Sequence, residues 1–185
     1  MEQNSLRRNL WNSAGKAGLL LGLLSSAYLF INQWSSAAEM PAFLSMVLNF
    51  ILWAAKFAGC IMLMMFFMKK FAAENPEARN STTFRFGMAT ALLSALVYAA
   101  VSFANVAFIS SDYYAEQMDT VMQAYAQIMD SNTLSQMEKM LGNMAQITFF
   151  TNLFYCFVYG TLLSGILSRN IPSRDPFADY RPEEQ

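Results

Sequence analysis

Residues 43–68 read FLSMVLNFILWAAKFAGCIMLMMFFM, an apolar run that contains a single charged side chain, Lys56. A helix needs about 20 mostly apolar residues to cross a membrane, because each residue adds about 1.5 Å across a hydrocarbon core of about 30 Å. The backbone must also satisfy its own hydrogen bonds there, since lipid offers no water. This run therefore predicts a transmembrane helix.

Three other apolar segments have a suitable length, at about residues 17–34, 86–109 and 147–167. Charged residues make up only 14% of the chain, compared with about 25% in an ordinary soluble domain. The sequence therefore predicts an all-α integral membrane protein with four transmembrane helices. We expect one membrane domain, residues 17–168, with a cytoplasmic tail at 1–16 and a disordered cytoplasmic tail at 169–185.

Basic side chains are distributed unevenly between the two sides of these spans. The loop between the third and fourth spans contains a single basic residue, Lys139, and the first loop contains none. All other lysines and arginines outside the spans lie in the two tails or in the link between the second and third spans. Positive charge marks the cytoplasmic side, so we predict that both termini are cytoplasmic.

The first apolar segment has an alternative interpretation as a cleaved signal peptide. Arg7 and Arg8 precede it, and the small residues Ser35 to Ala37 follow it. The apolar run is long for a signal peptide, however, and the bulky Trp34 crowds the candidate cleavage site. We therefore favour a retained first span.

Residues 110–146 form the only large polar loop and show a helical period. Apolar residues recur three or four positions apart at Tyr114, Met118, Val121, Tyr125 and Ile128. The pair Ser131-Asn132 is predicted to break this helix, and Ser135 lies three residues before Glu138, the spacing of a capping box. The loop therefore predicts an extracytoplasmic amphipathic helical hairpin.

Three interpretations of this hairpin remain open. Its apolar stripes could pack on each other and on the outer ends of the spans, which we favour. It could lie flat on lipid, but such helices usually carry Lys or Arg on the polar face, and this one is acidic. Its methionines could bind Cu(I), but the chain contains no histidine, so we predict no metal site.

Small residues recur every four positions in two spans. The first span carries Ala14, Gly18, Gly22 and Ser26, and the third carries Gly87, Ala91, Ala95 and Ala99. Small residues mark helix contacts in lipid, because they allow backbones to approach closely. We predict that these ridges pack against each other, with contact to a second copy of the chain as the alternative.

Lys56 lies near the middle of the second span, where a charge costs about 2.5 to 3.5 kcal/mol on insertion scales. Such a residue normally faces the bundle interior or water. Candidate polar neighbours are Asn49 on the same helix and Asn152 and Tyr155 on the fourth span. One hypothesis is a ligand or proton site. The other is a polar seam that fixes helix register.

Motifs of catalysis are missing from the sequence. It contains no phosphate loop, no dinucleotide fingerprint and no metalloprotease or nucleophile motif. The net charge of −1 gives no basic surface for nucleic acid. We predict a non-enzymatic accessory or assembly protein without a cofactor, whose partners are the bilayer and a second copy or another membrane protein. The alternative is an oligomeric transporter or channel subunit for a small solute or ion, which uses the Lys56 region.

The layout resembles an uncharacterised domain-of-unknown-function family of small four-span inner-membrane proteins, common in Bacteroidetes. The features that carry the resemblance are Gly18 to Gly22, Thr83 to Gly87, Met137 to Met140 and the short basic tail. The resemblance covers about Trp11 to Arg174 and implies a bacterial inner-membrane location. It implies no activity, cofactor or catalytic residue.

Overall fold

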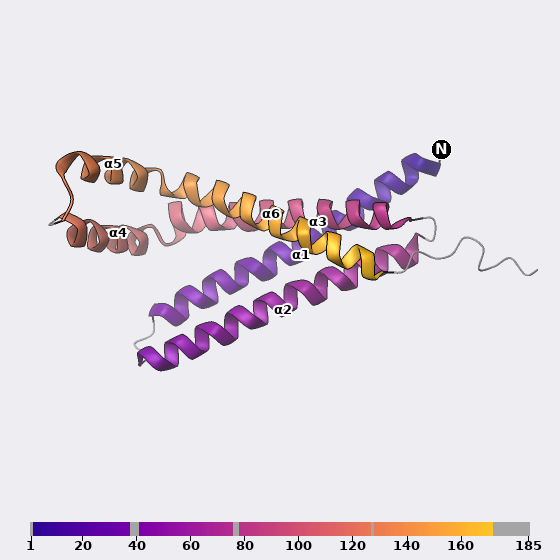
Figure 1. Cartoon of the computed structure of the whole chain (residues 1–185), viewed down its shortest axis with the longest axis horizontal. Coiled ribbons are helices and arrows are strands. Elements are labelled where there is room, and N and C mark those ends of the chain that lie inside the picture. The colour runs from indigo at the N-terminus through magenta and orange to yellow at the C-terminus, as the bar shows by residue number, and fades with distance from the viewer. Residues whose placement is uncertain (1, 38–40, 76–77, 127, 172–185) are drawn as a thin grey trace, which may run out of the picture.

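The computed structural model describes residues 2–37, 41–75, 78–126 and 128–171, and every element in these ranges is a helix (Figure 1). Four helices are long and apolar enough to cross a membrane. They are α1 (Glu2–Ala37), α2 (Ala42–Glu74), α3 (Asn80–Ala104) with its π-helical continuation η1 (Asn105–Ile109), and α6 (Met144–Asn170). The predicted all-α fold with four transmembrane helices is confirmed.

The helices extend further than the apolar segments that predicted them. α1 begins at Glu2, so the described part of the expected 1–16 tail is helical. α2 continues past Met68 to Glu74, and α3 begins at Asn80. Lys, Arg, Glu and Gln are good helix formers, so a helix need not stop where the apolar run stops. α6 ends at Asn170, and the rest of the expected C-terminal tail lies, from residue 172 onward, outside the described residues.

α3 is the central helix of the bundle, with α1 on one side and α6 on the other. The glycines of α1 make the first of these contacts. A Cβ atom on Gly18 would lie 2.7 Å from the Leu93 Cβ, and one on Gly22 would lie 2.6 Å from the Val97 Cβ. Real Cβ atoms almost never approach so closely. The backbones of α1 and α3 therefore touch where α1 lacks side chains, as small residues allow in membranes.

The predicted contact between the first and third spans is confirmed, but the ridge of α3 does not make it at Gly87 and Ala91. Gly87 and Ala91 of α3 face α6 instead, where a methyl group on Gly87 would overlap Ser164 and one on Gly160 would lie 2.6 Å from the Ala91 Cβ. The Ser164 hydroxyl also donates a hydrogen bond to the Phe84 carbonyl (3.0 Å). α3 has two neighbours. The face with Gly87 and Ala91 contacts α6, and a different face contacts α1.

The bundle is packed at one end and splayed at the other (Figure 1). We call the end where α1 begins and α6 ends the terminal end, and the opposite end the hairpin end. Toward the hairpin end, α1 and α2 diverge together from α3 and α6. Of the described side chains of α2, only Met64, Met68 and Phe71 are fully buried. The fully buried part of α2 therefore lies near the terminal end, while its middle packs along α1 and contacts α3 and α6 through side chains such as Lys56 and Phe57.

The polar loop forms α4 (Ser111–Ala126) and α5 (Ser131–Gly142), which extend beyond the spans at the hairpin end (Figure 1). The predicted hairpin is confirmed, but its break is misplaced. Ser131 starts α5 with Asp130 as the preceding cap residue, and the Ser135 hydroxyl donates to the Asn132 carbonyl (3.1 Å) instead of forming a capping box. Asp130 has the extended backbone that is typical of a residue preceding a helix, with φ −71° and ψ 159°.

Candidate functional site

Lys56 lies midway along α2, about 20 Å from both Phe43 and Lys69 at about 1.5 Å per residue. Its side chain points into the bundle. The Nζ atom lies 4.7 Å from the ring centroid of Tyr28 on α1 and 5.0 Å from that of Tyr98 on α3. An ammonium over an aromatic face is stabilised by the negative potential of the ring. The two tyrosines therefore hold the charge in the interior without a carboxylate.

A cavity of about 180 Å³ lies beside this amine. All four spanning helices contribute to its wall. Its hydroxyl- or thiol-bearing side chains are Ser25, Cys60, Ser94, Tyr98, Tyr155, Cys156 and Tyr159. The remaining wall is apolar. The cavity is thus a largely apolar space with one charged group.

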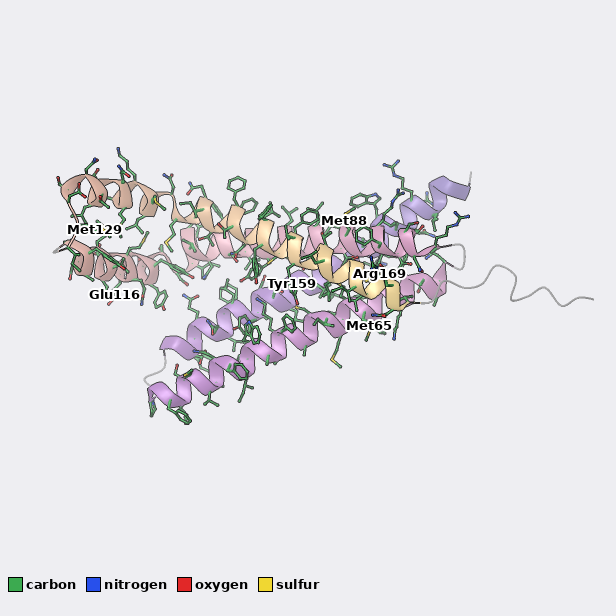
Figure 2. The ribbon with its side chains drawn as sticks, viewed as in Figure 1. Met65, Met88, Glu116, Met129, Tyr159 and Arg169 are labelled. Atoms are coloured by element: carbon green, nitrogen blue, oxygen red, sulfur yellow. The ribbon has the colours of Figure 1, made fainter. Side chains whose placement is uncertain are left out.

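The cavity opens to the flank of the bundle between α2 and α6. Trp53 of α2 is 53% exposed and Tyr155 of α6 is 68% exposed, although both line the cavity. The rings of Phe57 and Tyr159 meet across this seam with centroids 5.7 Å apart. Figure 2 shows Tyr159 halfway along α6, in the region where that helix passes over the others. The opening therefore faces the region that lipid chains occupy.

Buried side chains fill the space between the cavity and the terminal end. Met64, Met68 and Leu167 are buried there, and the rings of Phe71 and Phe86 stack with centroids 4.3 Å apart and planes 4° from parallel. These side chains belong to one buried apolar cluster. Buried apolar side chains therefore lie between the cavity and the terminal end.

The structure places the sequence-predicted residues differently around this cavity. Lys56 and Tyr155 line it, whereas Asn49 and Asn152 do not. Asn49 lies two helical turns from Lys56, and its side-chain oxygen is buried without a hydrogen-bond partner among the described residues. Asn49 was grouped with Lys56 because the two residues share a helix face, but two turns separate them by about 10 Å along the axis. Asn49 and Asn152 therefore do not line the cavity, contrary to the prediction that they share the site with Lys56.

Two features of the site were missed in the sequence. Tyr28 was not predicted to belong to the site. The feature that could have identified it is a tyrosine in the interior of an apolar span. The two cysteines, in spans far apart in sequence, line the same cavity as free thiols, and the Cys60 Sγ lies 3.8 Å from the Ser25 Oγ. Only the three-dimensional arrangement brings them to one wall.

A second polar cluster forms around Asn105, which is fully buried at the start of η1. Its Nδ2 donates to the Gln33 Oε1 (3.1 Å) and to the Tyr114 hydroxyl (3.2 Å), and the Ser110 Oγ donates to its Oδ1 (3.0 Å). The cluster joins α1, η1 and α4. Burial raises the pKa of Tyr114, against the smaller opposing effect of the Asn105 hydrogen bond. The satisfied amide indicates a structural role for this π-helical turn.

The hairpin has no fully buried residue among those described in α4 and α5. Met118, Met122 and Met137 are half-buried, whereas Val121 and Met140 are 40% and 62% exposed. Among the residues that the structure describes, no three His, Cys, Asp or Glu side chains lie together in a way that suits a metal ion. The two helices thus cover each other only partly.

These features define a class of protein: a multi-pass membrane protein made of four spanning helices, with a cavity beside a lysine. Residues 16–169 match the family described as "Protein of unknown function (DUF4199)", and the chain belongs to that family. The resemblance to a domain-of-unknown-function family is therefore confirmed. No curated protein and no solved structure matches the chain.

Proposed function

We propose that the protein is a non-enzymatic accessory or assembly protein of the bacterial inner membrane that binds another membrane protein through its outer hairpin. The observation that carries this proposal is the position of α4 and α5, which extend beyond the bundle with no fully buried side chain among the described residues. A hairpin that only stabilised the bundle would bury its apolar stripes against the spans. This one leaves apolar side chains exposed, as binding surfaces do.

The charge distribution supports an outer location for the hairpin and a cytoplasmic location for both termini. In Figure 2, Arg169 lies at the opposite end of the bundle from Glu116 and Met129. The terminal end also carries Arg7, Arg8, Lys16, Lys69, Lys70, Arg79 and Arg85, whereas the hairpin carries Lys139 as its one basic residue. This asymmetry is the arrangement that the positive-inside rule associates with a cytoplasmic terminal end.

The chemistry of the hairpin indicates what kind of partner it fits. The exposed apolar side chains of Val121, Tyr125 and Met140 require an apolar counterpart. Acidic residues line the other face of α4, including Glu116 and Asp119. A partner with an apolar ridge flanked by Lys or Arg would complement both features. We therefore propose the outer segment of another membrane protein, with a second copy of this chain as the other outcome.

Site-specific photo-crosslinking in cells tests this proposal. A photoreactive amino acid at Val121 or Met140 should give one discrete adduct, because these side chains face the partner. The matched control is Glu116, on the acidic face, which should give little or none. An adduct at twice the 20.8 kDa mass of the chain identifies a second copy. Equal labelling of both faces, or no adduct from either, would reject hairpin docking.

A transporter or channel subunit is the second candidate, and the cavity beside Lys56 is the observation that favours it. The buried cluster that contains Phe71 and Phe86 lies between that cavity and the terminal end. Solute would therefore have to pass between copies of the chain. Flux into liposomes that contain the purified protein, compared with liposomes that contain Lys56→Met, distinguishes this function from docking.

A further inference from the structure

The geometry points to a ligand site that goes beyond the proposed docking function: the cavity beside Lys56 binds the ring of a membrane-soluble quinone. The ligand class is a planar, neutral ring with carbonyl oxygens and an apolar tail. Four observations lead to this class. They are the size of the cavity, its aromatic mouth, the chemistry of its one charged group and its depth in the membrane.

The size of the cavity admits one ring system. Its volume is about 180 Å³, and an apolar protein cavity of about 150 Å³ is large enough to bind benzene. A whole long-chain lipid is far larger than this. The bound part of the ligand must therefore be a compact head, while any long tail stays outside.

The mouth of the cavity is built from aromatic rings that continue from α2 to α6. Trp53 and Phe57 stack with centroids 5.5 Å apart and planes at 21°, and Phe57 contacts Tyr159 at 5.7 Å. Offset-stacked and tilted rings at such distances attract one another. A planar ring that enters between these side chains gains the same contacts, which a saturated chain does not offer.

The charged group at the cavity is a hydrogen-bond donor. An ammonium has three donors and no acceptor, and Lys56 has no hydrogen bond or ion pair with any residue that the structure describes. The rings of Tyr28 and Tyr98 already stabilise its charge. The ligand therefore needs an acceptor oxygen but no charge of its own, and an anion would lose its hydration on entering. A quinone carbonyl provides such an oxygen.

The depth and the direction of the opening fit a ligand that is dissolved in the bilayer. Lys56 lies about 20 Å from each end of its apolar run. The opening lies between α2 and α6, where Trp53 and Tyr155 are exposed. A quinone ring can enter from the lipid through this opening and leave its tail among the acyl chains.

Trp53 provides a direct measurement, because quinones quench tryptophan fluorescence on contact. The full-length protein with Trp11→Phe and Trp34→Phe, in lipid nanodiscs, has Trp53 as its one tryptophan. The probe is a trimethylbenzoquinone that carries a decyl chain, whose fully substituted ring leaves no free carbon for the thiols of Cys60 and Cys156 to attack. We expect saturable quenching. Decylbenzene, which has the same tail and no carbonyl, should not compete with the probe.

Three variants in this background separate the site from general partition into lipid. Lys56→Met removes the donor and should weaken binding roughly tenfold or more, the usual effect of losing a hydrogen bond to a charged group. Cys156→Phe fills the cavity and should abolish saturable quenching. Lys69→Met, which removes an exposed lysine at the terminal end, should leave binding unchanged.

A second protein with Trp34 as its one tryptophan measures collisional quenching in the lipid, since Trp34 is 80% exposed near the hairpin end of α1. Linear quenching of Trp53 that matches that of Trp34 would overturn the proposal. Equal affinity in Lys56→Met would overturn it as well. Loss of the quenching at a decanoate concentration below that at which the quinone itself saturates would assign the cavity to an anion instead. None of these outcomes depends on hairpin docking, so the two proposals fail separately.

Discussion

Replacing Gly22 by alanine places a methyl group 2.6 Å from the Val97 Cβ and 3.1 Å from the Ser94 carbonyl oxygen. Both neighbours belong to α3, and the second is backbone, which cannot rotate away. Methyl carbons in contact lie about 3.5 to 4.0 Å apart. The two helices must therefore separate by roughly 1 Å at this point. Overpacking of this kind typically costs about 1 to 3 kcal/mol.

Gly15 is a matched control in the same helix, because a methyl group there meets no atom within 4 Å. Alanine is the better helix former by roughly 1 kcal/mol at either position. That gain cancels in the comparison of Gly22→Ala with Gly15→Ala. We expect Gly15→Ala to be neutral or stabilising and Gly22→Ala to be less stable than it by about 1 to 3 kcal/mol.

The assay is unfolding in detergent micelles by SDS titration, followed by circular dichroism. Equal unfolding midpoints for the two alanine variants would refute the argument, because they would show that α1 and α3 do not touch at Gly22.

Three further predictions follow from other sites. Asn105→Leu removes the buried amide that makes three hydrogen bonds and should destabilise the hairpin end by about 1 to 3 kcal/mol. The measurement is the rate of proteolysis of α4, which should rise. The control is Asn132→Leu, at an exposed position, which should have little effect. Because burial raises the pKa of Tyr114 above its ordinary 10.0, its contribution to stability is complete below about pH 10 and is lost as the pH rises through the folded-state value. Tyr114→Phe should therefore lose less stability than the wild type between pH 9 and pH 11 in SDS unfolding, and an identical loss would contradict this. Reporter fusions after Lys70 and after Asp130 should be cytoplasmic and external respectively, and an external signal at Lys70 would reverse the proposed orientation.

The membrane class and the family followed from local properties of the sequence. A span is recognised by the length of its apolar run, and each run can be assessed alone. The helix ends were less predictable. Glu2 and Glu74 lie beyond the apolar segments, in polar sequence that is equally compatible with helix or tail.

The partners of each helix could not be derived in this way. The ridge from Gly87 to Ala99 indicates a close approach but not which neighbour makes it, and α6 rather than α1 occupies the face at Gly87 and Ala91. The site shows the same limit. Lys56 was identifiable as a charge in an apolar span, whereas its contacts with Tyr28 and Tyr98 depend on the relative rotation of three helices.

The fully buried residues of α2 all lie near one end, so the helix has the geometry of a lever. Its fulcrum is the buried group Met64, Met68 and Phe71, and its arm, which packs along α1, runs to Phe43. That arm is about 30 Å long, so a rotation of about 5° moves its tip by about 3 Å. Trp53 and Lys56 lie on this arm. A tilt of α2 about its buried residues would therefore change the distance from Trp53 and Lys56 to α6.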